Sequence, residues 1–470
     1  MNKQKKIQHL HLRAGFGASY SVVKSGMSSG IESSVDALFR SSEKYTPLRN
    51  EYADMLPPVA EMQEMSGDRR KELLMRSQKE VMNLNAEWFR MMAYSEAQLR
   101  EKMTLFWHGH FACRTRVPLF CMNQNNTLRQ HALGKFGDLL HAVSKDPAML
   151  QFLNNQQNRK QRPNENFARE VMELFTMGRG NYSENDVKEA ARAFTGWGFD
   201  REGNFRIRDR FHDDGSKDFL GASGNLTGED ILNIILEKKQ TAIFICAKIF
   251  RHFVSDNVDV EIVESLSDKF FRSDYDIAVL MKEIFTSSWF YDDKYIGARI
   301  KSPAEYITGI SRILNLKFEN NKGLAGLQRA LGQLLFNPPN VGGWPGGRNW
   351  IDTSSLALRL RIPEQIFRAS NIEFDYKAND GDDGDEAAMK SGNRNRMKLR
   401  VSADASRIVN DFGGFRGSEA VEKMAEYLLQ PELSREKLDI VLRHCDESGG
   451  QDLAESASMR IMSLPEFQLC

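Results

Sequence analysis

The stretch from residue 68 to 107 is the feature that most limits how this chain can fold. It holds neither proline nor glycine, and its apolar residues recur at intervals built from three and four residues: Leu73, Val81, Leu84, Trp88 and Met91. This is the period of an amphipathic helix, whose apolar face must pack against other elements. Similar patterns fill most of the chain, so the sequence predicts a mainly α fold.

Two segments depart from the helical pattern. Near residues 198–210, Phe205 and Ile207 alternate with polar neighbours, which predicts a small β-hairpin. Residues 376–396 are polar and charged without a hydrophobic period, which indicates a flexible linker or loop. We therefore expect a main helical domain over 1–375 that carries every candidate site, and a helical subdomain over 397–470 packed against it.

Composition excludes several classes of protein. The 470 residues include 64 Lys and Arg against 64 Asp and Glu, and a neutral chain is a poor partner for nucleic acid. The longest apolar stretches, such as TAIFICAKIF, are shorter than the roughly 18 residues of a membrane-spanning helix. The five cysteines form no C-x-x-C pair, which argues against a cysteine zinc site. No apolar segment follows the basic start MNKQKKIQHL, so we expect no signal peptide and a cytoplasmic location.

Several longer phrases together resemble one bacterial family, the domain of unknown function 1800. They run in order from residue 9 to the end of the chain: HLHLRAGFG, KMTLFWHGHFA, RPNENFAREVMELFTMGRGNYSENDVKEAARAFTGWGF, FHDDGSKDFLG, IKSPAEYITG, LGQLLFNPPNVGGWPGGRNWIDTSSLALRLR and LPEFQL. The resemblance implies no established activity. It implies a partner, because such proteins are often encoded beside a sulfatase-like protein. It also makes the cell envelope the alternative location, because many relatives carry an export signal.

The phrase WHGHF places His108 and His110 two residues apart. On a helix two such side chains diverge by about 200°, but a helix that ends at Gly109 would let both rings converge on a metal ion. The other interpretation is that His110 is a hydrogen-bonded histidine of the core.

The next predicted helix carries Glu165, Arg169 and Glu173 at i, i+4 and i+8, with Glu170 beside them. Because little else of this helix is polar, we expect some of these charges to face the interior, where a carboxylate needs a cation or a metal ion. A network of salt bridges is one interpretation, and a carboxylate ligand or general base is the other.

The turn HDDGSK, which follows the predicted hairpin, contains His212, Asp213 and Lys217. A histidine beside an aspartate can bind a divalent ion or act as acid and base. An Asp-Gly turn also forms without any function.

The loop GGWPGGRNW surrounds Trp344 with glycines and adds Arg348. An aromatic ring with an arginine can form a platform for a sugar ring, although indoles also anchor loops to a core. A strip of Arg206, Arg208 and Arg210 lies between Phe205 and Phe211. Three arginines can hold a phosphate or sulfate, and a solvated strand face is the simpler interpretation.

Together these clusters predict one pocket around a divalent transition metal that activates water for hydrolysis. The predicted roles are metal binding for His108, His110 and His212, catalysis for Glu170, Glu173 and Asp213, and substrate binding for Glu165, Arg169, Lys217, Trp344 and Arg348. The preferred function is a metal-assisted hydrolase or ligand-binding enzyme acting on a polysaccharide or other anionic polymer. The alternative is a non-catalytic helical scaffold for the sulfatase-like partner.

Overall fold

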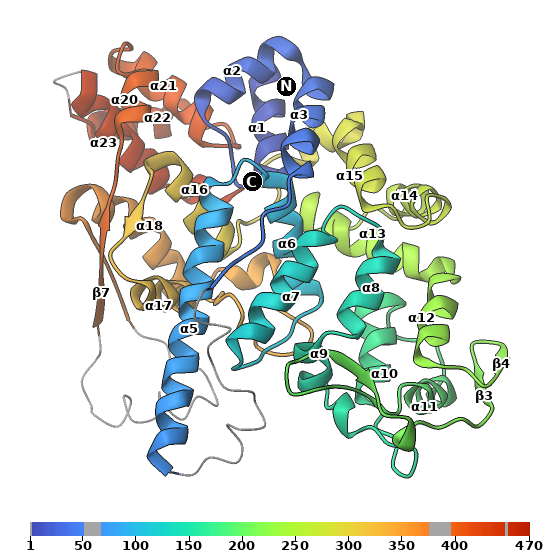
Figure 1. The fold of residues 1–470 in the computed structure, drawn as a ribbon. Helices are drawn as coiled ribbons and strands as arrows, with labels where there is room; N and C mark the ends of the chain where they lie inside the picture. The colour runs from blue at the N-terminus through green and yellow to red at the C-terminus, as the bar shows by residue number, and fades with distance from the viewer. Residues whose placement is uncertain (1, 51–66, 376–395, 447–449) are drawn as a thin grey trace.

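A computed structural model describes residues 2–50, 67–375, 396–446 and 450–470 of the chain (Figure 1). The predicted mainly α fold is confirmed. The N-terminal helices are α1 (Lys3–Ala14), α2 (Tyr20–Ser29), α3 (Ile31–Glu43), α5 (Gly67–Tyr94) and α6 (Gln98–His110). The long helical pattern is thus divided between α5 and α6. Gln98 Nε2 donates to the carbonyls of Met92 (3.0 Å) and Ser95 (2.7 Å), which satisfies acceptors left open where α5 ends.

The remaining helices form two groups, on either side of α6 in Figure 1. The first comprises α7 (Pro118–Gln130), α8 (Phe136–Ser144), α9 (Pro147–Phe152), α10 (Asn166–Glu170), α11 (Glu184–Ala193), α12 (Gly228–Leu236), α13 (Lys239–Phe253), α14 (Val260–Arg272) and α15 (Ile277–Thr286). The second comprises α16 (Pro303–Leu314), α17 (Asn321–Leu331), α18 (Thr353–Ala369), α20 (Ser406–Phe412), α21 (Gly417–Leu428), α22 (Arg435–Arg443) and α23 (Gly450–Met462).

Each group surrounds its own hydrophobic core. The first core contains Trp107 and Phe136, and the second contains Trp88 and Tyr306. The N-terminal segment joins the two, because Leu10 and Ala14 belong to the first core and Phe16 and Tyr20 to the second. The junction between the cores is therefore built around the end of α1.

Among the described residues, three small sheets interrupt the helices. The predicted hairpin is confirmed as β1 (Trp197–Phe199) and β2 (Phe205–Ile207), which pair antiparallel. A second hairpin consists of β3 (Lys217–Phe219) and β4 (Ala222–Gly224). The third sheet has the order β5-β7-β6, with β5 (Lys317–Phe318), β6 (Asn371–Asp375) and β7 (Arg396–Ser402). The hairpin expected near 198–210 is thus one of three β insertions.

The C-terminal part shares the second core. β7 pairs with both β5 and β6, and residues of α20, α21 and α23 lie in the same core as residues of α5 and α16. Of the predicted linker 376–396, residues 376–395 lie outside the described residues, and Arg396 begins β7. Within the described residues, no helix is long and apolar enough to cross a membrane.

Candidate functional site

The two histidines of WHGHF lie on one continuous helix. α6 passes through Gly109 and ends at His110, so the condition for the two rings to converge, a helix that ends at Gly109, is not met. Positions two apart on a helix point in different directions. The local reason for expecting both rings to converge is therefore removed.

His108 faces the second core. Its Nε2 accepts a hydrogen bond from the Phe336 N–H at 3.1 Å. The ring lies edge-on to Trp88, with 4.9 Å between centroids, and 5.6 Å from the ring of Trp344. Burial lowers the pKa of His108 to about 3, so the imidazole is neutral at pH 7.

His110 faces the first core. Its Nε2 lies 3.0 Å from the Phe175 carbonyl oxygen, which requires the ring proton to be on Nε2. Burial, and secondarily the positive charge of Lys248, lower the pKa of His110 to about 3. These are the contacts of a hydrogen-bonded core histidine, and they leave the buried Nδ1 without a partner among the described residues.

The charges of the ENFAREVMELF helix lie near the surface. α10 passes into a π-helical turn over Val171–Thr176, whose wider spacing interrupts the expected i, i+4, i+8 alignment. Arg169 pairs with Glu165 (3.2 Å) and Glu184 (2.7 Å), while Glu173 accepts a hydrogen bond from the Tyr182 hydroxyl at 2.8 Å. The side chains of Glu165, Arg169 and Glu173 are 26–38% exposed. These three charges therefore do not face the interior. Burial, followed by the nearby Glu173, raises the pKa of Glu170.

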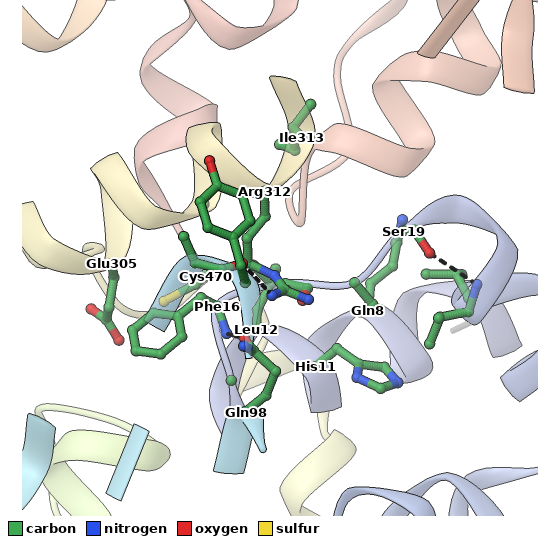
Figure 2. A pocket seen from close by; sticks show the side chains of 18 of the residues that line it. Gln8, His11, Leu12, Phe16, Ser19, Gln98, Glu305, Arg312, Ile313 and Cys470 are labelled. Atoms are coloured by element: carbon green, nitrogen blue, oxygen red, sulfur yellow. Dashed lines mark hydrogen bonds between the residues drawn. The ribbon is translucent and has the colours of Figure 1, made fainter. Parts of the chain in front are cut away.

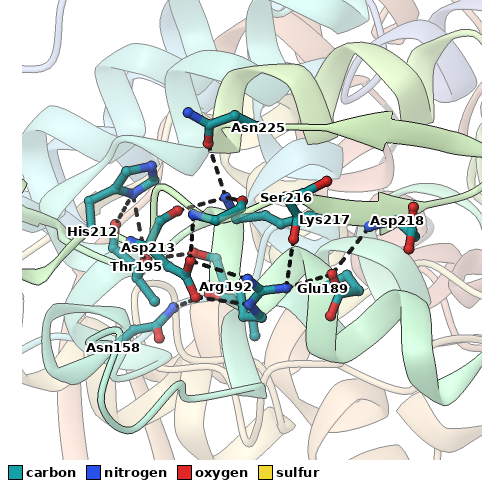
Figure 3. Close-up of polar contacts among 12 residues, drawn as sticks. Asn158, Glu189, Arg192, Thr195, His212, Asp213, Ser216, Lys217, Asp218 and Asn225 are labelled. Carbon is teal, nitrogen blue, oxygen red and sulfur yellow. Dashed lines mark hydrogen bonds and ion pairs between the residues drawn. The ribbon is translucent and has the colours of Figure 1, made fainter.

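The HDDGSK turn is fastened to the end of α11, and Figure 3 shows the contacts. Lys217 is buried, and its Nζ donates to the carbonyls of Asp213 (2.6 Å) and Gly215 (3.0 Å). Asp213 pairs with Arg192 at 2.8 Å, and this hydrogen bond holds the pKa of Asp213 below its usual range. His212 Nδ1 lies 2.8 Å from the Thr195 carbonyl oxygen. Each of the three predicted side chains is thus engaged in holding the loop.

The GGWPGGRNW loop packs directly against α6. Gly343 has φ +77°, and a Cβ at this position would lie 2.3 Å from the carbonyl oxygen of Gly109. Only glycine permits this approach. The contact brings Trp344 against His108, while Arg348 is exposed.

The structure therefore brings Trp344 to His108, and joins Asp213 to Lys217 within one turn. No hydrogen bond or ion pair between the described residues links these two groups to each other or to Glu170 and Glu173. The described ranges also hold no group of three or more His, Cys, Asp or Glu side chains placed to bind a metal ion. The roles assigned to these residues remain predictions.

A cavity of about 610 Å³ lies at the junction of the two cores. Its walls come from α1 and the loop after it, α2, α3, the end of α5, the start of α6, α16, α20, α21 and residues 467 and 470. Figure 2 shows part of this lining. Pockets at such junctions are common ligand sites. Leu12, Phe16 and Ile313 supply apolar surface, and the polar groups described next lie among them.

Arg312 of α16 is one of the charged residues that line the cavity, together with Arg407, Lys301 and Glu305. Its Nη1 donates to the Ala93 carbonyl at 2.7 Å, and its Nε to the Gly17 carbonyl at 3.2 Å. Its Nη2 has no hydrogen-bond partner and the guanidinium has no carboxylate partner among the described residues. Burial, with a contribution from the positive charge of Arg407, lowers the pKa of Arg312 to about 10.

Gln8 and His11 of α1 also line the cavity. Gln8 donates to the carbonyls of Glu426 (2.9 Å) and Tyr427 (2.8 Å), which leaves its buried Oε1 without a partner. Burial, with a contribution from Arg312, lowers the pKa of His11 to about 4, so its imidazole is neutral at pH 7.

One end of the cavity reaches a buried charge cluster centred on Glu305. Five buried cations interact with Glu305: Arg13, Lys102, Arg299, Lys301 and Arg359. Although burial opposes ionisation, Lys102 and Arg299 hold the pKa of Glu305 well below its usual range. Arg13 donates to the backbone oxygens of Tyr295 (2.8 Å) and Cys470 (2.7 Å).

The residues of this junction were not among those we predicted from sequence. Several of them come from phrases that carried the family resemblance: HLHLRAGFG supplies His11 and Arg13, KMTLFW supplies Lys102, and IKSPAEYITG supplies Lys301 and Glu305. Gln8 and Arg312 lie outside these phrases. The available signal was a charged side chain inside an otherwise apolar phrase. That signal is weak because such a charge usually lies on a solvated helix face.

Comparison with known proteins agrees with the resemblance. Residues 9–469 match the family described as protein of unknown function (DUF1800). No curated protein and no solved structure matches the chain.

Proposed function

We propose that this chain, which belongs to the family of proteins of unknown function DUF1800, binds a small anionic molecule in the cavity at the junction of its two cores. The observation that carries the proposal is Arg312. Charges largely removed from water are normally paired, and the side chain of Arg312 is only partly accessible to solvent. Arg312 has only neutral carbonyl partners among the described residues, and Nη2 is left free to bind an anion.

The other polar groups restrict the chemistry of the ligand. The free Oε1 of Gln8 is an acceptor and requires a donor, such as a hydroxyl or an amine. Leu12, Phe16 and Ile313 offer contact to a carbon skeleton. A hydroxy acid or sugar acid with a free carboxylate, or a phosphorylated equivalent, matches this set of groups.

The cavity also supports the enzymatic form of the proposal. A neutral histidine can accept a proton from a bound hydroxyl, and His11 lies in the same cavity as the anion-binding arginine. His11 and Glu305 both line the cavity, and neither is among the residues that the hydrolase prediction named. Metal-assisted hydrolysis and a scaffold role beside a sulfatase-like partner are less favoured, because no contact among the described residues specifically supports either.

Binding is tested by thermal unfolding with citrate, glucuronate and inorganic phosphate as probes. A ligand at 100 times its Kd adds about 2.7 kcal/mol to the free energy of unfolding. We expect at least one probe to stabilise the wild-type protein, Arg312→Met to lose this response, and Arg312→Lys to keep part of it. Arg90→Met, at an exposed arginine of α5 paired with Glu87, is the matched control and should respond like the wild type.

Two results would contradict the proposal. One is an equal response of the wild type and Arg312→Met to every probe. The other is no response to any probe, together with native mass spectra of gently purified protein that show no bound small molecule.

A further inference from the structure

Three guanidinium groups gather around one aromatic ring, at a site that shares no lining residue with the cavity. The Cζ atoms of Arg159, Arg210 and Arg208 lie 4.4, 4.5 and 5.4 Å from the ring centroid of Phe211. Each distance is within the range of a cation–π contact. The ring thus holds three like charges close together.

The backbone brings these residues together from two segments. The Lys160 N–H donates to the Phe211 carbonyl at 2.9 Å, and Arg159 and Arg162 form a β-bridge. The Arg208 guanidinium lies over Gly198, where a Cβ would be only 2.9 Å from Nη2. Arg208 Nη2 donates to the Gln156 carbonyl at 2.5 Å, while its buried Nε has no partner among the described residues. Arg208 is therefore held in place, and Arg159 and Arg210 are exposed beside it.

No carboxylate among the described residues forms an ion pair with the three arginines of this cluster. None of Arg159, Arg208 and Arg210 has a carboxylate within 4.0 Å in the part of the chain that the structure describes. Arg206, on the same hairpin, differs because it pairs with Asp200 at 3.1 Å. Burial, and then the charges of Arg159 and Arg210, lower the pKa of Arg208.

We propose that Arg159, Arg208 and Arg210 bind a tetrahedral oxyanion, the phosphate or sulfate group of a larger ligand. Guanidinium groups donate in a planar fork that fits such oxygens, and two or three of them surround one tetrahedral group. A bound dianion relieves the repulsion among the three cations, which no carboxylate of the described residues does. The site goes beyond the proposed cavity function and is independent of it.

The test compares ligands by isothermal titration calorimetry: inorganic sulfate, inorganic phosphate, dextran sulfate, and carboxymethyl dextran of matched charge density. The free ions and the ester-bearing polymer distinguish the two sources of the oxyanion. We expect dextran sulfate to bind the wild type more tightly than carboxymethyl dextran does. The double variant Arg159→Gln/Arg210→Gln should weaken this binding by about tenfold or more, because each lost charge-assisted contact contributes more than 1 kcal/mol.

The control removes the same charge elsewhere. Arg179→Gln/Arg206→Gln changes two exposed arginines outside the cluster and should alter the affinity less than about twofold, as expected for exposed charges. Equal losses in the two double variants would overturn the proposal, since net charge would then explain binding. Equal binding of carboxymethyl dextran would also overturn it.

A measurement on the wild-type protein tests the site even if the double variant does not fold. Phenylglyoxal modifies accessible arginines, and mass spectrometry locates the products. We expect sulfate, compared with chloride at equal ionic strength, to slow modification of Arg159 and Arg210 but not of Arg206. Failure to protect the first two selectively would contradict the site.

Discussion

Lys102 of α6 and Glu305 of α16 form an ion pair in the interior of the protein, with only 1% and 4% of their side chains exposed. Glu305 also accepts a hydrogen bond from the Ser302 N–H at 2.7 Å and so caps its own helix. The pair joins two helices at the cavity end that carries the most charge. Glu305 thus supplies negative charge to a region that contains five buried cations.

Removing this carboxylate should destabilise the protein strongly. Glu305→Gln removes the carboxylate that pairs with the buried Lys102 and lies near Arg299, and breaking a buried ion pair typically costs 3–5 kcal/mol. Urea unfolding measures the loss. Glu87→Gln, in an exposed pair with Arg90, is the control and should cost less than about 1 kcal/mol. The double variant Lys102→Met/Glu305→Leu should recover part of the loss; no recovery would show that the charges themselves are not the cause.

The contact between the GGWPGG loop and α6 should not tolerate a side chain. In Gly343→Ala the new Cβ meets the Gly109 carbonyl oxygen at 2.3 Å, in addition to the strain of φ +77°. We expect a loss of about 2–4 kcal/mol in the free energy of unfolding, because strain and overpacking add. Gly332→Ala, at a left-handed position with φ +97° and no atom within 4 Å, should lose about 1 kcal/mol. Equal losses would mean that the loop does not approach α6 closely in solution.

Asp146 should make stability depend on pH. It caps α9 by accepting hydrogen bonds from the N–H groups of Ala148 (2.9 Å) and Met149 (3.2 Å), yet burial raises its pKa from 3.8 to about 7. Between these values the folded state holds a proton that the unfolded state has released. The contribution of Asp146 to stability is therefore greatest at low pH and is lost as the pH rises towards 7.

The asparagine of the Asp146→Asn variant has no titrating proton. As the pH rises from about 4 to 7, we expect the free energy of unfolding of the variant to increase relative to that of the wild type, by up to about 1.4 kcal/mol per pH unit. The buried histidines are common to both proteins and cancel in this difference. Urea unfolding across the pH range measures it, with the helix-capping variant Asp276→Asn as control for the loss of a capping carboxylate. A difference that stays constant with pH would contradict the raised pKa.

Elemental analysis decides whether the predicted metal is present. The Nε2 atoms of both His108 and His110 are engaged with backbone groups, and Asp213 is engaged with Arg192. We therefore expect protein purified without chelator to hold less than about 0.1 equivalent of any transition metal, since a real site needs several free ligands. Zinc or manganese near one equivalent, with a stability that falls on adding chelator, would restore the hydrolase prediction.

Local features were predictable because their interactions lie within a few residues. Ser183 and Asp186 form the capping box that their spacing indicates, and Phe205 and Ile207 lie in a hairpin strand. The same local rules did not predict two features of the helices. Gly109 did not end α6, because tertiary packing holds the helix to His110 despite the cost of a glycine. The π-helical turn after Glu170 could not be inferred from spacing, since the i+4 count assumes a regular helix.

By itself the sequence determined the helical periods, their caps and the family, because each depends on neighbouring residues or on phrases read in order. Only the tertiary structure decided which charges lie inside. Every residue of α6 except Gly109 is buried, so its period does not distinguish an inward-facing Lys102 from a solvated one. Lys102 and Glu305 are 203 residues apart, and their pairing follows from how α6 and α16 pack. Burial is a property of the folded chain, and no local sequence pattern contains it. The same is true of the place of Arg312 in the cavity wall, without a carboxylate partner among the described residues.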